Sequence, residues 1–310
     1  MARKQMTPAQ KAKARKQREA KAKALFDQLA DRGQAFTDSD RYQSYLRASR
    51  HFHHYSANNQ FLIWWQAPEA SAVNSYKRWQ ELGRQVVKGA KAIRILAPRP
   101  VKYTEEVEEN GRTEEVERRY TRFVSVPVFA YEQTEPMEDF TGDPWEPMRF
   151  PTLTEDVGDR HFEALAGSLR STGIPVSEEA IPAGIGGYYM PASHSITIGQ
   201  GHPALHRLHV LIHEAAHAMH YAIDKADAKG NTSAYREIVA ESAAYIVANA
   251  VGFDVGAHSE QYVGVHARIE PEAMEKALPM IQKISHTLIE SLESALSDET
   301  EPAPAELAAA

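Results

Sequence analysis

The sequence predicts an α+β protein with two domains: an N-terminal α+β domain and a C-terminal zincin-like domain, mostly helical with a small sheet. The chain has 310 residues, which is long for one core and sufficient for two. Apolar residues follow a helical period at first, alternate with polar ones after about residue 85, and return to a helical period after about residue 160. A Pro-, Asp- and Glu-rich segment without periodicity, residues 135–151, separates the two parts.

Composition divides the chain into five expected segments. Residues 1–24 hold nine basic residues against one acid, Glu19, which indicates a frayed helix or a disordered basic tail. The first domain is expected at 25–134, the linker at 135–151 and the second domain at 152–296. Residues 297–310 are rich in Glu, Pro and Ala, and we expect a disordered tail there.

The first domain is expected to begin with helices and continue with strands. Apolar spacing predicts helices within residues 25–55 and 56–66. Residues 86–96 alternate apolar and basic side chains across Gly89, which predicts a strand or hairpin with a basic face. Segments 101–108 and 116–131 flank Asn110-Gly111, a strong hairpin signal.

The second domain is expected to be built from helices with one short strand. Helices are predicted at residues 162–172, 203–223, 234–251 and 270–296, and the strand at 195–198. Gly252 is a plausible C-terminal cap for the third of these helices. Pro279 is expected to kink or break the last helix near Leu278.

The chain contains no cysteine, so a metal ion must be held by His, Asp or Glu. No apolar run approaches the length that spans a bilayer, and the first residues carry no apolar signal core. These features favour a cytoplasmic protein without membrane association.

The segment from His213 to His217 has the pattern His-Glu-Ala-Ala-His. Two histidines at i and i+4 lie on one helix face and can reach one ion, and the acid after the first lies beside a bound water. We therefore expect His213 and His217 to bind Zn²⁺, although other divalent ions are possible, and Glu214 to act as the catalytic base.

A catalytic zinc site needs a third protein ligand. Glu237 and Glu241 stand at i and i+4 on a helix that is otherwise mostly apolar, so both carboxylates are expected to face a compensating partner rather than solvent. We expect Glu237 to be the third ligand and Glu241 to orient His213, with the reverse assignment as the alternative.

Further residues near the motif have side chains that can donate a hydrogen bond to a reaction intermediate. His194, Tyr188, Tyr189 and Tyr221 are candidates for stabilising an oxyanion, although packing roles are the more probable assignment for each. His220 is expected not to be a ligand. The strand at 195–198 is expected to form a wall along which an extended peptide pairs by main-chain hydrogen bonds.

Basic and aromatic residues concentrate in residues 55–99, and residues 77–102 hold eight basic residues against one acid, Glu81. Aromatic rings can stack on bases while cations follow phosphates, so single-stranded DNA is a candidate partner. The alternative is that the tryptophans are core residues and the cations solvate a sheet face. The candidate DNA-binding residues are Asn58, Asn59, Trp64, Trp65, Lys77, Trp79, Arg84, Lys88, Lys91 and Arg94.

Residues 55–63, 72–79 and 82–93 resemble the N-terminal domain of the ArdC antirestriction family. Asn58, Trp79, Gly83-Arg84 and Lys88-Gly89 match in order and spacing. Residues 213–217 and 235–241, followed by an amphipathic helix, are similar to the family's zincin-like peptidase domain. The resemblance covers roughly residues 25–295. Met219-His220-Tyr221 departs from the family pattern, and so does the absence of a Trp near residues 263–268.

This resemblance implies a protein of a plasmid or phage that binds single-stranded DNA, protects incoming DNA from restriction, and carries a zinc metallopeptidase domain acting on a protein or peptide. Two alternatives remain open from the sequence. The metal site could be structural only, in a protein that protects DNA by binding it. Otherwise, the chain could be a metallopeptidase whose basic domain recognises an acidic protein.

Overall fold

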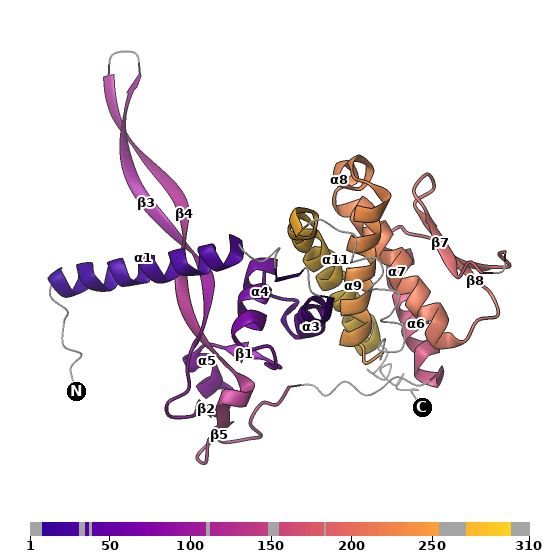
Figure 1. Ribbon diagram of the computed structural model, residues 1–310, viewed down its shortest axis with the longest axis horizontal. Coiled ribbons are helices and arrows are strands. Elements are labelled where there is room, and N and C mark those ends of the chain that lie inside the picture. Colours follow the sequence, from indigo (N-terminus) through magenta and orange to yellow (C-terminus); the bar gives the residue numbers. More distant parts are fainter. Residues whose placement is uncertain are drawn as a thin grey trace, which may run out of the picture. The chain divides into compact units, whose positions relative to one another are not determined.

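The computed structural model describes residues 8–30, 35–36, 39–109, 112–147, 155–182, 184–253 and 271–298. Contacts divide the chain into two compact units. The first comprises residues 1–32 and 58–147, and the second residues 33–57 and 148–310. Figure 1 shows strands and short helices in the first unit and a helical bundle with a small sheet in the second, which confirms the α+β class.

The first unit is organised by a long antiparallel hairpin of β3 (Ile93–Glu109) and β4 (Arg112–Ala130). Their register pairs Ile93 with Val128 and continues to Glu109 opposite Arg112, which confirms the predicted hairpin. Helix α1 (Pro8–Ala30) crosses both strands in Figure 1. It buries Ala22, Leu25 and Leu29, and Phe26 contacts Phe123 of β4 edge-on.

Two amide side chains of α4 (Ala57–Gln66) hold the beginning of β3. The Asn59 amide accepts a hydrogen bond from Leu96 N and donates to Leu96 O, at 2.9 and 2.8 Å. The Gln66 amide does the same for Arg94, at 2.9 Å each. Both side chains satisfy main-chain groups of a strand edge that would otherwise lack partners, and they fix the helix against the sheet.

Trp79 fills the centre of a second small cluster in this unit. It lies on α5 (Tyr76–Glu81), is completely buried, donates its indole N–H to Phe129 O at 2.8 Å, and packs 5.6 Å from Trp145. Beside it, β2 (Arg84–Val86) pairs with β5 (Thr134–Pro136), while β1 (Val73–Asn74) pairs with β4. A 3-10 turn, η2 (Tyr131–Gln133), joins β4 to β5.

Helices form the core of the second unit. They are α3 (Ser39–Ser49), α6 (Glu155–Ser171), α7 (Ala204–Ile223), α8 (Lys225–Gly230), α9 (Ser233–Ala250) and α11 (Pro271–Asp298), with the 3-10 turn η1 (Arg50–Phe52) after α3. The bounds of α7, α9 and α11 agree closely with the predicted ones, whereas α6 begins earlier than predicted and α8 was not predicted. Helix α9 is buried along most of its length and contacts α3, α7 and α11. Gly252 follows it with a φ of +85°, as expected for a C-terminal cap.

The small sheet of the second unit has the order β6-β8-β7. Strand β6 (Val176–Glu179) is parallel to β8 (Ser195–Gly199), and β7 (Gly187–Met190) is antiparallel to it. Strand β8 is the predicted strand, but both of its edges are already paired. The expectation that it forms the peptide-binding wall is therefore wrong. Strands β6 and β7 are the edges of this sheet, and β7 is the edge that lines the pocket described below.

Four expectations about the organisation differ from the structure. Residues 8–24 are helical and form most of α1, which is anchored by its apolar side chains. Residues 39–57 pack in the second unit, because the aromatic side chains of α3 lie against α9. Residues 135–147 pack against the first unit through β5 and Trp145. Strand β2 pairs with β5 rather than with β3 across Gly89.

Two further expectations concern the helix and tail after residue 270 and the presence of membrane-spanning helices. Helix α11 continues through Pro279, so the proline does not end it. Residues 299–310 lie outside the described part of the chain. Within the described residues, no helix is long and apolar enough to cross a membrane.

The contact between α3 and α9 includes a buried hydrogen bond, Tyr42 Oη to Ser242 Oγ at 2.8 Å, between two side chains with no exposed surface. We expect Tyr42→Phe to lower the free energy of unfolding by about 1–3 kcal/mol, because the Ser242 hydroxyl loses its partner while buried. Urea denaturation measures this loss. Addition of Ser242→Ala should restore part of it, and no recovery would show that packing rather than hydrogen bonding is responsible.

Candidate functional site

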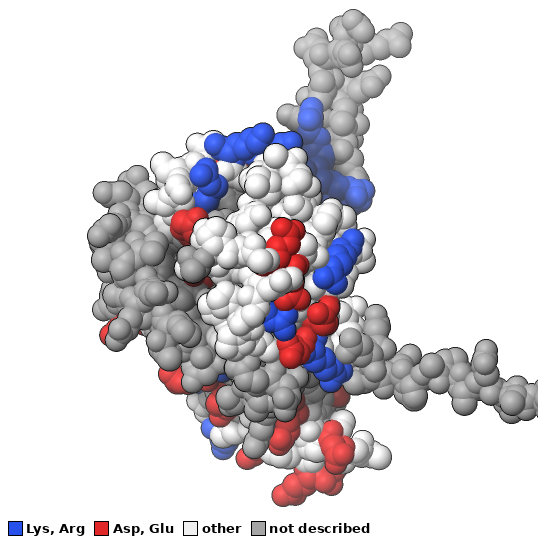
Figure 2. Space-filling view, turned by 90° about the vertical axis from the view of Figure 1, so that its right-hand side faces the viewer, with Lys and Arg blue, Asp and Glu red and all other residues white. Residues whose placement is uncertain are grey.

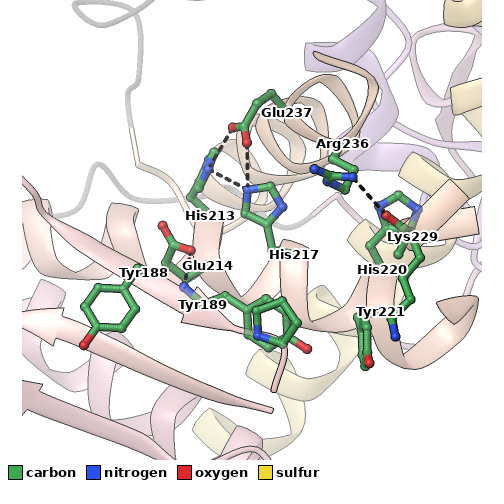
Figure 3. Close-up of a pocket in the computed structure, with 12 residues that line it drawn as sticks. Tyr188, Tyr189, His213, Glu214, His217, His220, Tyr221, Lys229, Arg236 and Glu237 are labelled. Atoms are coloured by element: carbon green, nitrogen blue, oxygen red, sulfur yellow. Dashed lines mark hydrogen bonds and ion pairs between the residues drawn. The ribbon is translucent and has the colours of Figure 1, made fainter. Parts of the chain in front are cut away.

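Three side chains from two helices meet at one end of a pocket of about 590 Å³. His213 and His217 come from α7, one turn apart, and Glu237 comes from α9 (Figure 3). The pocket is also lined by Tyr188 and Tyr189 of β7. Helix α7 places both histidines on the same face because 3.6 residues make one turn.

The atoms of these side chains are close enough to share an ion. His213 Nε2 and His217 Nε2 are 3.2 Å apart. Glu237 Oε2 is 3.5 Å from His213 Nε2, and its Oε1 is 3.5 Å from His217 Nε2. Donors held about 2.0–2.2 Å from one tetrahedral zinc ion are roughly 3.3–3.6 Å apart. The three side chains therefore fit a divalent ion.

Glu241 approaches the other side of the His213 ring. Its Oε1 is 3.5 Å from His213 Nδ1, one turn along α9 from Glu237. Hydrogen bonding by a carboxylate to Nδ1 keeps the proton on that nitrogen and the lone pair on Nε2, which points toward Glu237. Glu237 thus contacts both Nε2 atoms, and Glu241 contacts the far nitrogen of one ring.

The histidines and carboxylates of this cluster stabilise one another's charged forms. Burial lowers the pKa of His213, but hydrogen bonds with Glu237 and Glu241 outweigh burial and raise it to about 10. Hydrogen bonds with His213 and His217 lower the pKa of Glu237 well below its usual range. Without an ion, a proton on His213 balances the carboxylates. A divalent cation would supply positive charge in place of that proton.

Glu214 lies between the histidines and the edge of the sheet. Its Oε2 accepts a hydrogen bond from the Tyr189 main-chain N–H at 2.8 Å (Figure 3). This N–H belongs to β7 and points away from β8. The bond fixes the direction of the carboxylate and places it beside the free edge of the strand.

The remaining candidates occupy the pocket rim. Tyr189 Oη is 2.7 Å from His194 Nδ1, and burial raises the pKa of Tyr189 to about 12, so this phenol is protonated at neutral pH. Tyr188 and Tyr221 line the same pocket. His220 is buried, also lines this pocket, and lies with its Nε2 2.8 Å from Asp227 Oδ2.

Sequence reasoning did not identify Lys229 and Arg236, which also line the pocket. Arg236 donates to the main-chain oxygens of Ala228 and Asn231, so it closes the α8 turn against α9. Lys229 lies over the Tyr221 ring at 5.7 Å. Arg236 follows Thr232, the N-terminal cap residue of α9, by four positions. Nothing in the sequence around Arg236 distinguishes it from a solvent-exposed arginine.

The structure corrects part of the predicted DNA-binding set. Trp64, Trp79 and Arg84 are buried, and Arg84 hydrogen bonds with Thr134 and stacks on Tyr131. Asn59 is occupied with the main chain of β3. These four support the fold because their polar groups meet main-chain or side-chain partners inside the unit.

The other members of the set reach the surface of the first unit. Asn58, Trp65, Lys77, Lys88 and Lys91 are exposed, and Arg94 is half-buried. Lys88 lies in a tight turn. Gly89 has a φ of +91°, and Ala90 N donates to Val87 O, so the lysine side chain points away from the turn. The sequence missed Tyr103 and Tyr120, exposed on one face of the hairpin with ring centroids 5.8 Å apart.

Comparisons with known proteins identify the first part of the chain. Residues 30–129 match the family model of the N-terminal domain of anti-restriction factor ArdC. The search of curated proteins found no match.

Two solved structures of the antirestriction ArdC protein from plasmid R388 are similar to this chain. The metal-free form is 22% identical over 77% of this chain and 86% of the other, with a TM-score of 0.46. The Mn(II)-bound form is 19% identical over 77% and 89%, with a TM-score of 0.41. Residues 30–129 are therefore similar to the N-terminal domain of anti-restriction factor ArdC.

Proposed function

We propose that the chain is an antirestriction protein of a mobile element whose first unit binds single-stranded DNA and whose second unit is a metal-dependent peptidase. The observation that carries the peptidase proposal is the meeting of His213, His217 and Glu237 in one pocket with Glu214 beside them. Two neutral imidazoles and a carboxylate are a donor set that Zn²⁺ accepts, and it also suits other divalent ions.

The residues around this cluster have the parts that peptide hydrolysis requires. A bound divalent ion would supply Lewis-acid chemistry, which polarises a carbonyl and makes water more acidic. Glu214 would take the proton from the attacking water on Oε1, because Oε2 is held by Tyr189 N, and would deliver it to the leaving amine. The free edge of β7 would align an extended substrate by main-chain hydrogen bonds.

The phenol of Tyr189 is a further group that this reaction could use. Because its pKa is raised to about 12, it remains a donor throughout the neutral range. Its hydrogen bond with His194 Nδ1 holds the ring at the pocket rim. Tyr189 would thereby donate to the oxyanion that forms when water adds to the scissile carbonyl.

Glu214→Gln tests the catalytic part of this proposal. We expect the variant to retain its metal and to cleave unfolded, fluorescently labelled casein roughly 10²–10⁴-fold more slowly, because the amide cannot accept the proton. Metal content and cleavage rate are measured on the same preparations. Equal cleavage by the variant and the parent chain would exclude Glu214 as the base.

The structural-metal alternative predicts a different outcome. If the parent chain cleaves no casein, and Glu214→Gln protects incoming DNA from restriction as well as the parent does, the metal serves only the fold. In that case Glu237→Ala should lower the melting temperature and reduce protection in parallel.

The DNA part of the proposal rests on the exposed cations and rings of the first unit. Lys88 and Lys91 project from the turn between β2 and β3, and Trp65 is 40% exposed on α4. Cations of this kind follow phosphates, while exposed rings stack on bases. On the side of the second unit seen in Figure 2, the described charged residues form small groups of either sign among uncharged ones, so the first unit is the better candidate.

Removal of the two turn lysines should change the salt dependence of binding. We expect Lys88→Ala/Lys91→Ala to reduce the slope of log affinity against log salt for a fluorescent oligo-dT by about 1.4, because each lost phosphate contact contributes roughly 0.7 on a single strand. Fluorescence anisotropy measures the slope, with Lys283→Ala on α11 as the control. Absence of oligo-dT binding at low salt would favour recognition of an acidic protein instead.

A further inference from the structure

A second group of histidines lies in the second unit, outside the pocket just described. His53 and His54 follow η1, and His286 lies on α11. The ring centroids of His53 and His54 are 3.7 Å apart, and those of His53 and His286 are 5.7 Å apart. One nitrogen from each of the three side chains lies within 4.8 Å of the others.

The hydrogen bonds of His53 determine which of its nitrogens carries a proton. Nδ1 lies 3.1 Å from the main-chain oxygen of Arg50, which can only accept, so Nδ1 is the donor. The lone pair of the neutral ring is then on Nε2. That atom is buried and, among the residues the structure describes, has no hydrogen-bond partner. Burial lowers the pKa of His53, so the ring is neutral at pH 7.

His286 presents the same pattern with its nitrogens exchanged. Nε2 lies 3.3 Å from Glu290 Oε2, so the carboxylate holds a proton on Nε2 and leaves the lone pair on Nδ1. Nδ1 is also buried without a hydrogen-bond partner in the described part of the chain. Buried polar atoms without partners are uncommon in folded proteins, and here two imidazole lone pairs occur in one cluster.

We propose that His53 Nε2, His286 Nδ1 and His54 bind a second divalent transition-metal ion, with Zn²⁺ as the probe that tests it. Three neutral imidazoles are a donor set that first-row transition ions prefer. His54 is exposed, so it can rotate to bring its nitrogen to the roughly 3.3 Å spacing of donors around a tetrahedral zinc ion. Solvent completes the fourth position.

The surroundings of the cluster favour a cation. The Arg50 carbonyl and Glu290 each hold the outer nitrogen of a ligand, which is the usual way in which metal-binding histidines are oriented. The bound ion would connect the end of η1 to α11, which already touch through the Gln282 Nε2 to His53 O bond at 3.2 Å.

Metal binding by the full chain, purified without a histidine tag, tests this proposal. His213→Ala/His217→Ala is the background, because it removes the first site and makes the result independent of the peptidase proposal. We expect the background to bind one equivalent of Zn²⁺ by calorimetry and to give a visible absorption spectrum with Co²⁺. Zn²⁺ should also raise its melting temperature.

A second substitution in this background identifies the ligands. Addition of His286→Ala should abolish the stoichiometric binding and the zinc-dependent rise in melting temperature. His54→Ala should weaken binding by more than about 100-fold, and Glu290→Gln, which changes only a positioning residue, by roughly 10- to 100-fold. His161→Ala, a histidine of α6 in neither cluster, should change nothing.

Two results would overturn the assignment. One is a background chain that binds no Zn²⁺ at stoichiometric concentration, as expected if a water molecule bridges the two lone pairs. The other is a His286→Ala variant that binds like His161→Ala. The melting temperature without metal shows whether each variant folds, so a loss of binding is not confused with unfolding.

Discussion

Glu237→Ala should eliminate stoichiometric metal binding at the pocket, whereas Glu241→Ala should weaken it by roughly 10- to 100-fold. The two glutamates lie one turn apart on the same helix and differ in what they touch. Glu237 is 3.5 Å from the Nε2 atoms of both His213 and His217, while Glu241 is 3.5 Å from the outer nitrogen, Nδ1, of His213. Each variant removes one carboxylate, so the pair is matched in charge and in helix position.

The measurement is zinc affinity by competition with a chromophoric chelator. It is made in a His286→Ala background, so that the second histidine cluster does not contribute to the result. Equal losses for both variants would show that the carboxylates share one role. A larger loss for Glu241→Ala would reverse their assignment and require α9 to rotate in the presence of the ion.

Trp79→Ala should destabilise the first unit by about 3–5 kcal/mol, the range for truncating a fully buried aromatic side chain. The indole has no exposed surface, packs against Trp145 and Tyr131, and donates to Phe129 O. Its loss leaves a cavity and removes one hydrogen bond to Phe129 O. Any effect on DNA binding would then follow from unfolding of the unit.

Trp65 is the matched control, because it is a tryptophan of the same unit with 40% of its surface exposed. We expect Trp65→Ala to change stability much less than Trp79→Ala and to weaken oligo-dT binding by about 1–3 kcal/mol if the ring stacks on a base. Denaturant unfolding and anisotropy on both variants separate the two effects. Reduced DNA binding by Trp79→Ala at unchanged stability would place that indole in the interface instead.

The shared face of the two pocket histidines was predictable because it depends on local periodicity. A helix repeats every 3.6 residues, so His213 and His217 must share a face once α7 forms. Glu237 and Glu241 share a face of α9 for the same reason. Their position on an apolar helix indicated that both would be turned toward a partner, and the structure brings each to a different atom of the histidine pair.

Exposure in the first unit was harder to predict. Trp64 and Trp65 are neighbours of the same type, yet one is 5% exposed and the other 40%, because α4 turns only one of them toward the core. Arg84 seemed suitable for a phosphate, but Thr134, fifty residues later, lies beside it once β2 pairs with β5. The sequence of a short strand does not show which other strand it will pair with.

The sequence by itself determined the helix faces, including the one shared by His213 and His217, and the β3–β4 hairpin, because these follow from periodicity and turn chemistry over a few residues. Tertiary structure decided the rest. It assigned α3 to the second unit, brought Glu237 to the two histidines, placed the edge strand β7 beside the pocket, and brought His53 and His54 to His286 from more than two hundred residues away. Contacts between distant segments depend on which apolar faces pack together, and local spacing carries no information about that choice.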